Sequence, residues 1–250
     1  MIHEKAKRAG ILILLSFLAI VSPVNGWDNL DVGCPYSSGL QIIDREGYAL
    51  GFHQAWRNAV WVQYRLTAIE AGTVICGRTD DFREDPEVIG CATLLDYVRS
   101  GYDRGHLAPS ADMRWDRRVQ SESFFMSNMT PQHPNLNRGV WADLEREVRR
   151  YALREGSVVI ATGPVFFGKE AKYIGNRVLV PDACYKVIYD ETEPRKMIGF
   201  IIPNRKCPKD FYLYAVTVDE VERITGLDFF CAVEGADMLE AALDVEAWRK

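Results

Sequence analysis

The sequence predicts an α+β domain in which a largely antiparallel central sheet is flanked by helices. Three observations lead to this fold class: two β-rich runs separated by a short turn, a long amphipathic helical segment earlier in the chain, and a composition that is 48% hydrophobic and 26% charged. A chain of 250 residues with this composition can bury a sizeable core. The composition excludes a disordered chain, a collagen-like rod and a coiled coil.

The N-terminus has the layout of a secretory signal peptide. Three basic residues precede an apolar run over residues 10–22, and small residues then suit cleavage after Gly26. A membrane anchor is the alternative, but the run is shorter than the roughly 18–20 residues that span a bilayer. We therefore expect residues 1–26 to direct export, to the medium or the periplasm. Residues 27–250 are expected to form a single domain with no membrane attachment after cleavage.

Five runs rich in β-branched and aromatic residues are expected to form strands. They are, in chain order, Val60–Thr67, Val158–Ala161, Tyr185–Tyr189, Met197–Ile202 and Phe211–Val216. Gly163 and Pro164 are expected to end the second strand. The turn-forming residues between the third and fourth strands predict an antiparallel hairpin.

Helices are expected at Leu136–Arg154, at Val218–Thr225 and near Ala236–Leu243, with Gly226 ending the second. Residues of the first helix that are spaced at about 100° per residue form one apolar stripe, by which the helix should pack on the sheet. The stripe consists of Val140, Trp141, Leu144, Val148 and Tyr151.

The charge balance argues against a partner that binds through a broad basic surface. The net charge is −5, and removal of residues 1–26 makes it −7. The charge is uneven, because residues 99–150 carry nine arginines against seven acidic residues. We therefore expect a local arginine cleft on an acidic body, and a solvated mixture of charges is the alternative. The arginines near the candidate site include Arg114, Arg117, Arg118 and Arg138.

Six cysteines in an exported chain predict up to three disulfides. Six cysteines allow 15 pairings. The expected pairs are two local ones, Cys76–Cys91 and Cys184–Cys207, and one that ties the ends of the domain, Cys34–Cys231. A zinc site is the alternative, but the chain has no Cys-x-x-Cys motif and few histidines.

The segment Gly101–Met113 contains the first candidate site residues. His106 follows Arg104 by two positions, so both side chains would lie on one face of a strand. A guanidinium beside an imidazole lowers the imidazole pKa and keeps it neutral near pH 7, and a neutral imidazole can accept a proton from water. The same guanidinium can hold a phosphate oxygen. The alternative is a histidine that is satisfied in a loop by Asp103.

The segment Ser127–Glu145 contains the others. Asn137 lies on the line of the apolar stripe at the helix start, while Glu145 and Arg149 flank the stripe one helical turn apart. An inward amide needs a partner, and hydrated Mg²⁺ takes few protein oxygens and would supply one. The alternatives are a helix cap for Asn137 and a surface ion pair between Glu145 and Arg149.

Taken together, these segments resemble the DNA/RNA non-specific endonuclease family, whose fold is the ββα-metal nuclease fold. The resemblance rests on Asp-Arg-Gly-His at 103–106, on Asn-Arg-Gly-Val-Trp at 137–141, and on Glu145 with Arg149. It covers roughly residues 51–230. Further similar stretches are Trp61–Leu66, Thr162–Phe166, Gly199–Asn204 and Val218–Phe230.

The resemblance implies roles for individual residues. His106 would be the general base that activates water, and Asn137 the only direct protein ligand of one Mg²⁺, with Mn²⁺ as a substitute metal. Glu145 would hold waters on that metal. Arg104 and Arg149 would stabilise the phosphate and the transition state. Two further residues are expected at the substrate: Arg138, and a family arginine matched by Arg78 with Arg83 as the alternative.

The leading hypothesis is therefore an exported Mg²⁺-dependent endonuclease that hydrolyses DNA and RNA to 5′-phosphate products, with a homodimer as a candidate assembly. A non-catalytic secreted module that binds nucleic acid or another partner through the same fold is the main alternative. A phosphodiesterase for small nucleotides is a third reading, which the shape of the cleft would distinguish. A disulfide-stabilised binding protein with a coincidental motif is a fourth.

Overall fold

The computed structural model describes residues 28–36, 38–168 and 170–249, so the expected signal peptide lies outside the described residues. A seven-stranded sheet in the order β1-β2-β3-β6-β9-β10-β11 forms the centre of the fold, and every neighbouring pair is antiparallel. Its strands are β1 (Gln41–Asp44), β2 (Ala49–His53), β3 (Asn58–Thr67), β6 (Ser157–Val165), β9 (Ala183–Asp190), β10 (Lys196–Pro203) and β11 (Ala215–Val216). The predicted α+β class with a largely antiparallel sheet is confirmed.

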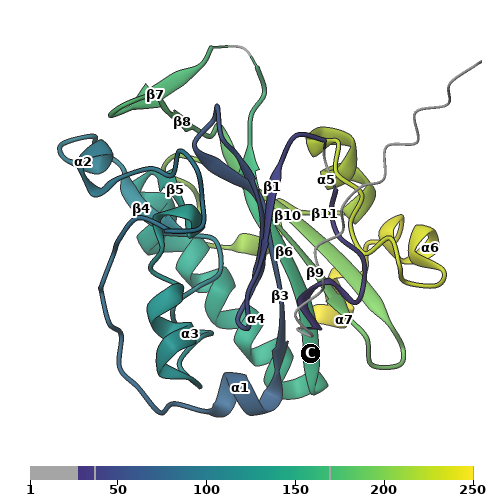
Figure 1. Ribbon diagram of the computed structural model, residues 1–250. Coiled ribbons are helices and arrows are strands. Elements are labelled where there is room, and N and C mark those ends of the chain that lie inside the picture. The colour runs from purple at the N-terminus through teal and green to yellow at the C-terminus, as the bar shows by residue number, and fades with distance from the viewer. Residues whose placement is uncertain (1–27, 37, 169, 250) are drawn as a thin grey trace, which may run out of the picture.

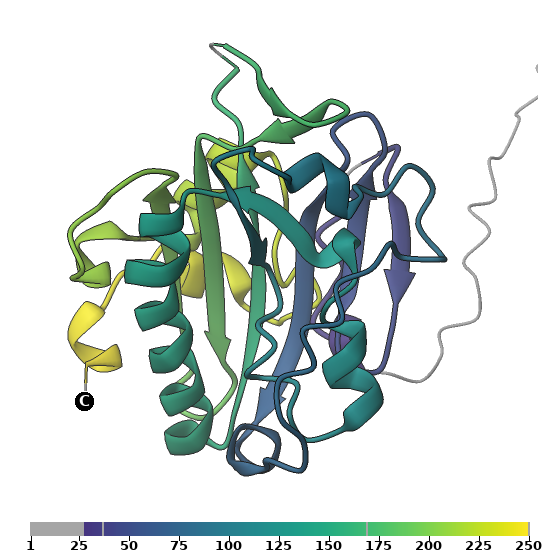
Figure 2. The same ribbon diagram turned by 90° about the vertical axis from the view of Figure 1, so that its left-hand side faces the viewer.

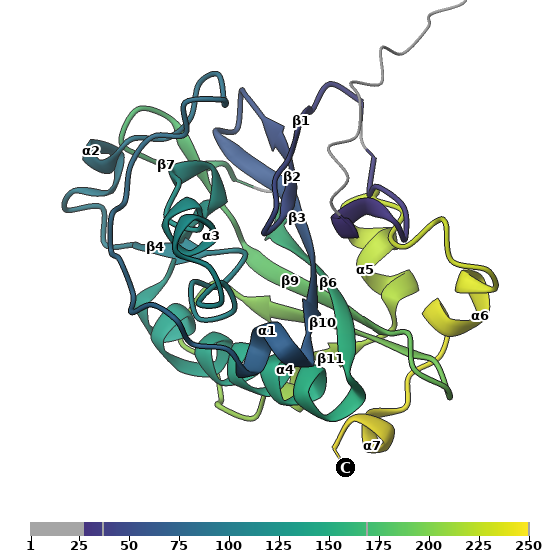
Figure 3. The same ribbon diagram turned by 60° about the horizontal axis from the view of Figure 1, so that its bottom comes forward.

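Helices cover both faces of this sheet. Figure 1 views the sheet close to edge-on, with α4 (Ala142–Glu155) and α3 (Arg117–Glu122) on one side and α5 (Val218–Thr225) and α6 (Ala236–Glu240) on the other. Figure 2 looks onto the α4 face, and Figure 3 shows the sheet between the two groups of helices. Two separate hydrophobic clusters result, one on each face.

The remaining elements are short. They are η1 (Asp28–Leu30), α1 (Ala68–Gly72), α2 (Leu94–Tyr97), β4 (Asp103–His106), η2 (Met126–Asn128), β5 (Met129–Gln132), η3 (Leu136–Trp141), β7 (Lys172–Ile174), β8 (Val178–Val180), η4 (Phe211–Tyr214) and α7 (Val245–Trp248). No helix in the described ranges is long and apolar enough to cross a membrane.

The long helix follows the predicted stripe. All five stripe residues are at most 1% exposed and belong to the cluster on the α4 face. The first turns differ from a regular α-helix, because η3 is a π-helical segment with a kink at Gly139 (φ −115°, ψ −118°). Asn137 lies in η3 before the kink, whereas Glu145 lies in α4 after it. Helix α5 has the predicted bounds, and Gly226 ends it in the left-handed conformation (φ 71°).

Two of the strand predictions need correction. The strand β6 does not end at Gly163 and Pro164 but continues to Val165. It can do so because its pairing with β3 stops at Thr162, so Pro164 pairs only with β9 and loses no hydrogen bond to a second neighbour. The run at 211–216 is mostly the 3₁₀ helix η4, which begins where the Asp210 side chain accepts the backbone N–H of Tyr212.

The structure does not show the expected disulfides, because all six cysteines are free in it. Cys76 lies against the carbonyl oxygens of Arg114 and Asp116, whereas Cys91 belongs to the α4-face cluster, which does not include Cys76. Cys34 and Cys231 are neighbours, since Cys231 Sγ lies 4.0 Å from the Cys34 carbonyl oxygen. The expected pair Cys34–Cys231 is therefore close in space, although it forms no disulfide in the structure.

A small two-stranded sheet lies beside α4 on the same face. Strand β4 pairs with β5 in antiparallel register, and η3 and α4 follow β5 along the chain. This β4–β5–α4 unit is the ββα element of the fold. Gly105 is required there, because a Cβ at this position would lie 2.3 Å from Cδ of the buried Gln132 side chain on the neighbouring strand β5.

Replacing Gly105 with alanine is therefore expected to lower the free energy of unfolding by about 1–3 kcal/mol, the usual cost of overpacking a filled interior. Urea unfolding monitored by circular dichroism measures the change. Gly77→Ala is the matched control for added volume, since nothing lies within 4 Å of a Cβ built at the exposed Gly77. Equal stability of Gly105→Ala and the wild type would contradict the close approach.

Candidate active site

The β4–β5–α4 unit brings the predicted residues together from two directions. Strand β4 carries Arg104 and His106, while η3 and α4 carry Asn137 and Glu145. These four side chains line one pocket of about 220 Å³, together with Arg78 and Pro109–Ala111. The sequence motifs, which lie about 30 residues apart, thus form one site.

His106 is a buried histidine with an unsatisfied ring nitrogen. Its ring packs edge-on against Phe124, with centroids 4.9 Å apart, and against Phe82. The Nε2 atom is buried and has no hydrogen-bond partner among the described residues. Burial, followed by the positive charges of Arg78 and Arg104, lowers the pKa of His106 to about 3. The His106 imidazole is therefore neutral near pH 7, as predicted, although burial rather than Arg104 is the main cause of its lowered pKa.

Two arginines hold positive charge at this pocket. Arg104 is exposed, and its guanidinium carbon lies 4.0 Å from the centre of the Phe82 ring. Arg78 donates to Ser110 Oγ and to Asp80 Oδ1, each at 2.7 Å, and its guanidinium lies over Phe124. Arg83, the alternative to Arg78, instead pairs with Asp81 and stacks on Phe125. The position of Arg78 favours it over Arg83.

Asp103 accepts hydrogen bonds from two neighbouring site residues, Asn137 and Arg138. Its Oδ2 accepts from Asn137 Nδ2 at 2.9 Å and from Arg138 Nε at 2.7 Å, and its Oδ1 accepts from Arg138 Nη2 at 2.6 Å. Asp103 is therefore not the hydrogen-bond partner of His106. Asn137 is not a helix cap either, since it lies inside η3 and its side chain binds Asp103. Because Asn137 directs its amide nitrogen to Asp103, its Oδ1 is the atom left to contact a cation.

Glu145 and Arg149 do not form the surface pair that was the alternative reading. Arg149 Nη1 instead pairs with Oδ1 of the fully buried Asp112 at 2.7 Å, and Tyr64 donates to the other oxygen of Asp112 at 2.8 Å. Arg149 therefore lies behind the pocket wall. Burial raises the pKa of Glu145 to about 7, although Lys186 opposes this shift.

Asp112 and Lys186 are the residues that the sequence reasoning missed. Lys186 is fully buried on β9, its Nζ has no hydrogen-bond partner among the described residues, and it lies 5.0 Å from the Trp141 ring. A lysine inside an otherwise apolar strand was the available signal for Lys186. No spacing in the sequence marked Asp112.

A second pocket of about 390 Å³ adjoins the first and shares Arg78, Arg104 and Asn137 with it. It extends past Asp103 and Arg138 to Leu94 and Val98 at α2. Together the two pockets form a groove that runs past His106, a shape that suits a polymer better than a small nucleotide.

Fewer arginines line the groove than the sequence predicted. Arg78, Arg104 and Arg138 line the groove, but the arginines around α3 do not. Arg118 pairs with Glu46 and Glu122, and Arg114 donates to the carbonyl oxygen of Cys76. Closeness in the sequence did not predict these contacts, because residues 112–136 do not line the groove.

The comparisons with known proteins agree with this geometry. A model of the family described as "DNA/RNA non-specific endonuclease" matches residues 25–236. The chain belongs to the DNA/RNA non-specific endonuclease family. It is 35% identical to human mitochondrial endonuclease G over 76% of this chain and 69% of that protein. It is 33% identical to the nuclease of Serratia marcescens over 86% of this chain and 85% of that one.

The endonuclease fold is confirmed by a solved structure of EndoG in complex with EndoGI. That structure has a TM-score of 0.77 and 31% identity to this chain, and the match covers 82% of this chain and 91% of EndoG. As a member of the DNA/RNA non-specific endonuclease family, the chain is an endonuclease.

Proposed function

We propose that this endonuclease is exported, depends on Mg²⁺ and hydrolyses phosphodiester bonds in both DNA and RNA, leaving 5′-phosphate ends. The observation that carries the proposal is the single pocket shared by His106, Arg104, Asn137 and Glu145. Water attacks phosphorus, the bond to the 3′ oxygen breaks, and no covalent intermediate is needed. Arg138, paired with Asp103 on the groove rim, and Arg78 are the proposed substrate-binding residues.

The residues present fit a hard divalent cation. Asn137 presents an amide oxygen, and Glu145 adds a carboxylate to the same pocket, which is the type of ligand that Mg²⁺ prefers. When bound, Mg²⁺ supplies positive charge that stabilises the charge building on the phosphate. Mn²⁺, which accepts the same ligands, is expected to substitute for it.

The protein groups have distinct tasks. The neutral His106 ring accepts the proton of the attacking water, and because Nε2 is buried, we assign that task to Nδ1. Arg104 holds a phosphate oxygen through its guanidinium donors. Arg149 acts from behind the wall, since it is paired with Asp112 next to Glu145. Contacts to phosphate carry little sequence information, which supports broad specificity.

Digestion of plasmid DNA and of RNA by residues 27–250, with Mg²⁺ and with EDTA, tests this function. We expect cleavage of both polymers with Mg²⁺ and none with EDTA, and labelled products should carry 5′-phosphates. A folded but inert protein would instead support the non-catalytic module. Protein sequencing of the secreted chain tests export, since a mature N-terminus at Trp27 is expected, and light scattering measures whether it is a homodimer.

Activity on long DNA is expected to fall as salt rises from about 50 mM to about 200 mM, because a few groove arginines must attract a polyanion to an acidic protein. The rate of plasmid cleavage across this range measures the effect. A small phosphodiester such as bis(p-nitrophenyl) phosphate is the control, since it is too small to span the groove. Salt-independent cleavage of long DNA would contradict an electrostatic groove.

A further inference from the structure

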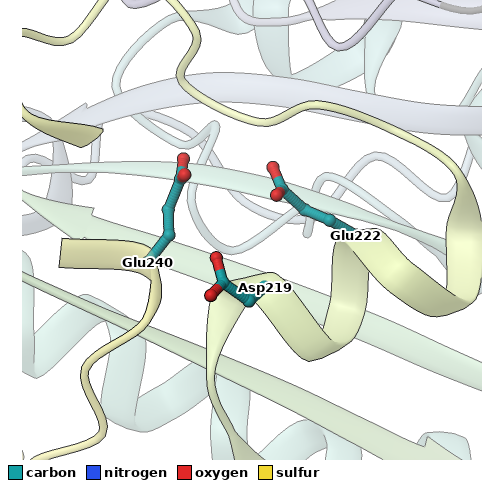
Figure 4. A group of neighbouring side chains, drawn as sticks. All are labelled: Asp219, Glu222 and Glu240. Atoms are coloured by element: carbon teal, nitrogen blue, oxygen red, sulfur yellow. The ribbon is translucent and has the colours of Figure 1, made fainter. Parts of the chain in front are cut away.

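A cluster of three carboxylates lies on the face of the sheet opposite the active site. Asp219 and Glu222 come from α5, and Glu240 is the last residue of α6. One oxygen from each lies within 4.8 Å of the other two. Figure 4 shows the three side chains pointing toward one another across the gap between the two helices.

Glu240 is the unusual member of this cluster. Its side chain belongs to a residue that is only 5% exposed, and its Oε1 has no hydrogen-bond partner among the described residues. A buried carboxylate without a donor or a counter-charge is costly. The other two carboxylates increase that cost, because like charges repel at this separation.

No described basic side chain forms an ion pair with the cluster. Arg223, the arginine of α5, is occupied by Glu220 through two bonds of 2.7 Å. Glu222 accepts one hydrogen bond, from the backbone N–H of Phe229. Burial, followed by the negative charges of the nearby acidic groups, raises the pKa of Glu240 to about 8; these groups are Glu222, Asp228, Asp219 and Asp237.

We propose that Asp219, Glu222 and Glu240 bind a divalent cation, with Ca²⁺ as the best fit, which ties α5 to α6. Oxygens bound to one Ca²⁺ at about 2.3–2.6 Å lie at most about 5 Å apart, as the cluster oxygens do. Ca²⁺ tolerates irregular ligand sets, whereas Mg²⁺ requires near-octahedral geometry and gives up its waters reluctantly.

The surroundings allow the ion to enter and to keep water ligands. Asp219 is exposed, and a pocket of about 290 Å³ lined in part by Asp228, Asp237 and Glu240 adjoins the cluster. The site would serve stability rather than catalysis. The segment it would fix packs Val221, Phe229 and Phe230 onto the hydrophobic cluster of this face, whereas His106 and Asn137 lie on the other face.

Isothermal titration of the metal-free protein with CaCl₂, together with thermal unfolding, tests the proposal. Glu240→Gln removes the buried ligand, and Asp219→Asn is a second variant at an exposed position where misfolding is not expected. Glu234→Gln is the matched control, because it removes an exposed carboxylate from the neighbouring loop outside the cluster. Comparison with the wild type separates this site from any metal at the active site.

We expect the wild type and Glu234→Gln to bind one more Ca²⁺ per chain than either cluster variant. Ca²⁺ should raise the Tm of the first two by several degrees and leave the cluster variants unchanged. All four proteins should cleave plasmid DNA equally with Mg²⁺, so failure of this site would not bear on the nuclease proposal. The same Ca²⁺ stoichiometry and Tm shift in all four would overturn the site, and an equal shift with Mg²⁺ would overturn the preference for calcium.

Discussion

Replacing His106 with alanine is expected to lower kcat/KM for plasmid cleavage by about 10²- to 10⁴-fold, the usual contribution of a general base. The ring is the only imidazole in the pocket that also contains Asn137 and Glu145. Because its pKa is lowered to about 3, it is neutral and able to accept a proton at any pH near neutrality. Initial rates on supercoiled plasmid with Mg²⁺ measure the loss.

His53→Ala is the matched control for this experiment. His53 stacks on Trp56, with ring centroids 4.2 Å apart, and lines a separate pocket with Val60 and Pro164. Its removal should leave kcat/KM unchanged. Partial recovery of His106→Ala by added imidazole would support a direct role in proton transfer. Full activity of purified His106→Ala would mean that another group is the base.

The sequence predicted the parts of this site that local patterns encode. The stripe from Val140 to Tyr151 follows from helical periodicity, and burial of all five members follows from it. The hairpin of β9 and β10 follows from two β-rich runs with turn residues between them. His106 and Asn137 were located from their short motifs, which the fold brings to one pocket.

The remaining features depend on contacts between distant parts of the chain. Asp112 gained its role from Tyr64 and Arg149, which lie 48 and 37 positions away. Residues 211–214 have the composition of a strand, but the Asp210 cap and packing of the aromatic rings make a 3₁₀ helix. Sequence patterns report the local propensity of a segment but not its tertiary contacts. They therefore did not predict the residues that support the site.

The pair of Arg149 and Asp112 gives the largest expected effect on stability. Arg149→Met would leave the Asp112 carboxylate, which is fully buried, with only the Tyr64 hydroxyl as a partner. Removing one member of a buried ion pair typically costs about 3–5 kcal/mol. Urea unfolding of the metal-free protein should show a loss of this size. Arg146→Met on the same helix is the matched control, because its pair with Asp143 is exposed and should contribute about 0–1 kcal/mol.

A double variant separates the structural role of Arg149 from its proposed role at the phosphate. Arg149→Met combined with Asp112→Leu removes both charges, so it should be more stable than Arg149→Met alone. If Arg149 also stabilises the transition state, the double variant should regain stability without regaining kcat/KM. Recovery of both together would show that Arg149 acts only by holding Asp112 and the wall behind Glu145. Additive losses of stability would contradict the buried pair itself, because two residues in direct contact should couple.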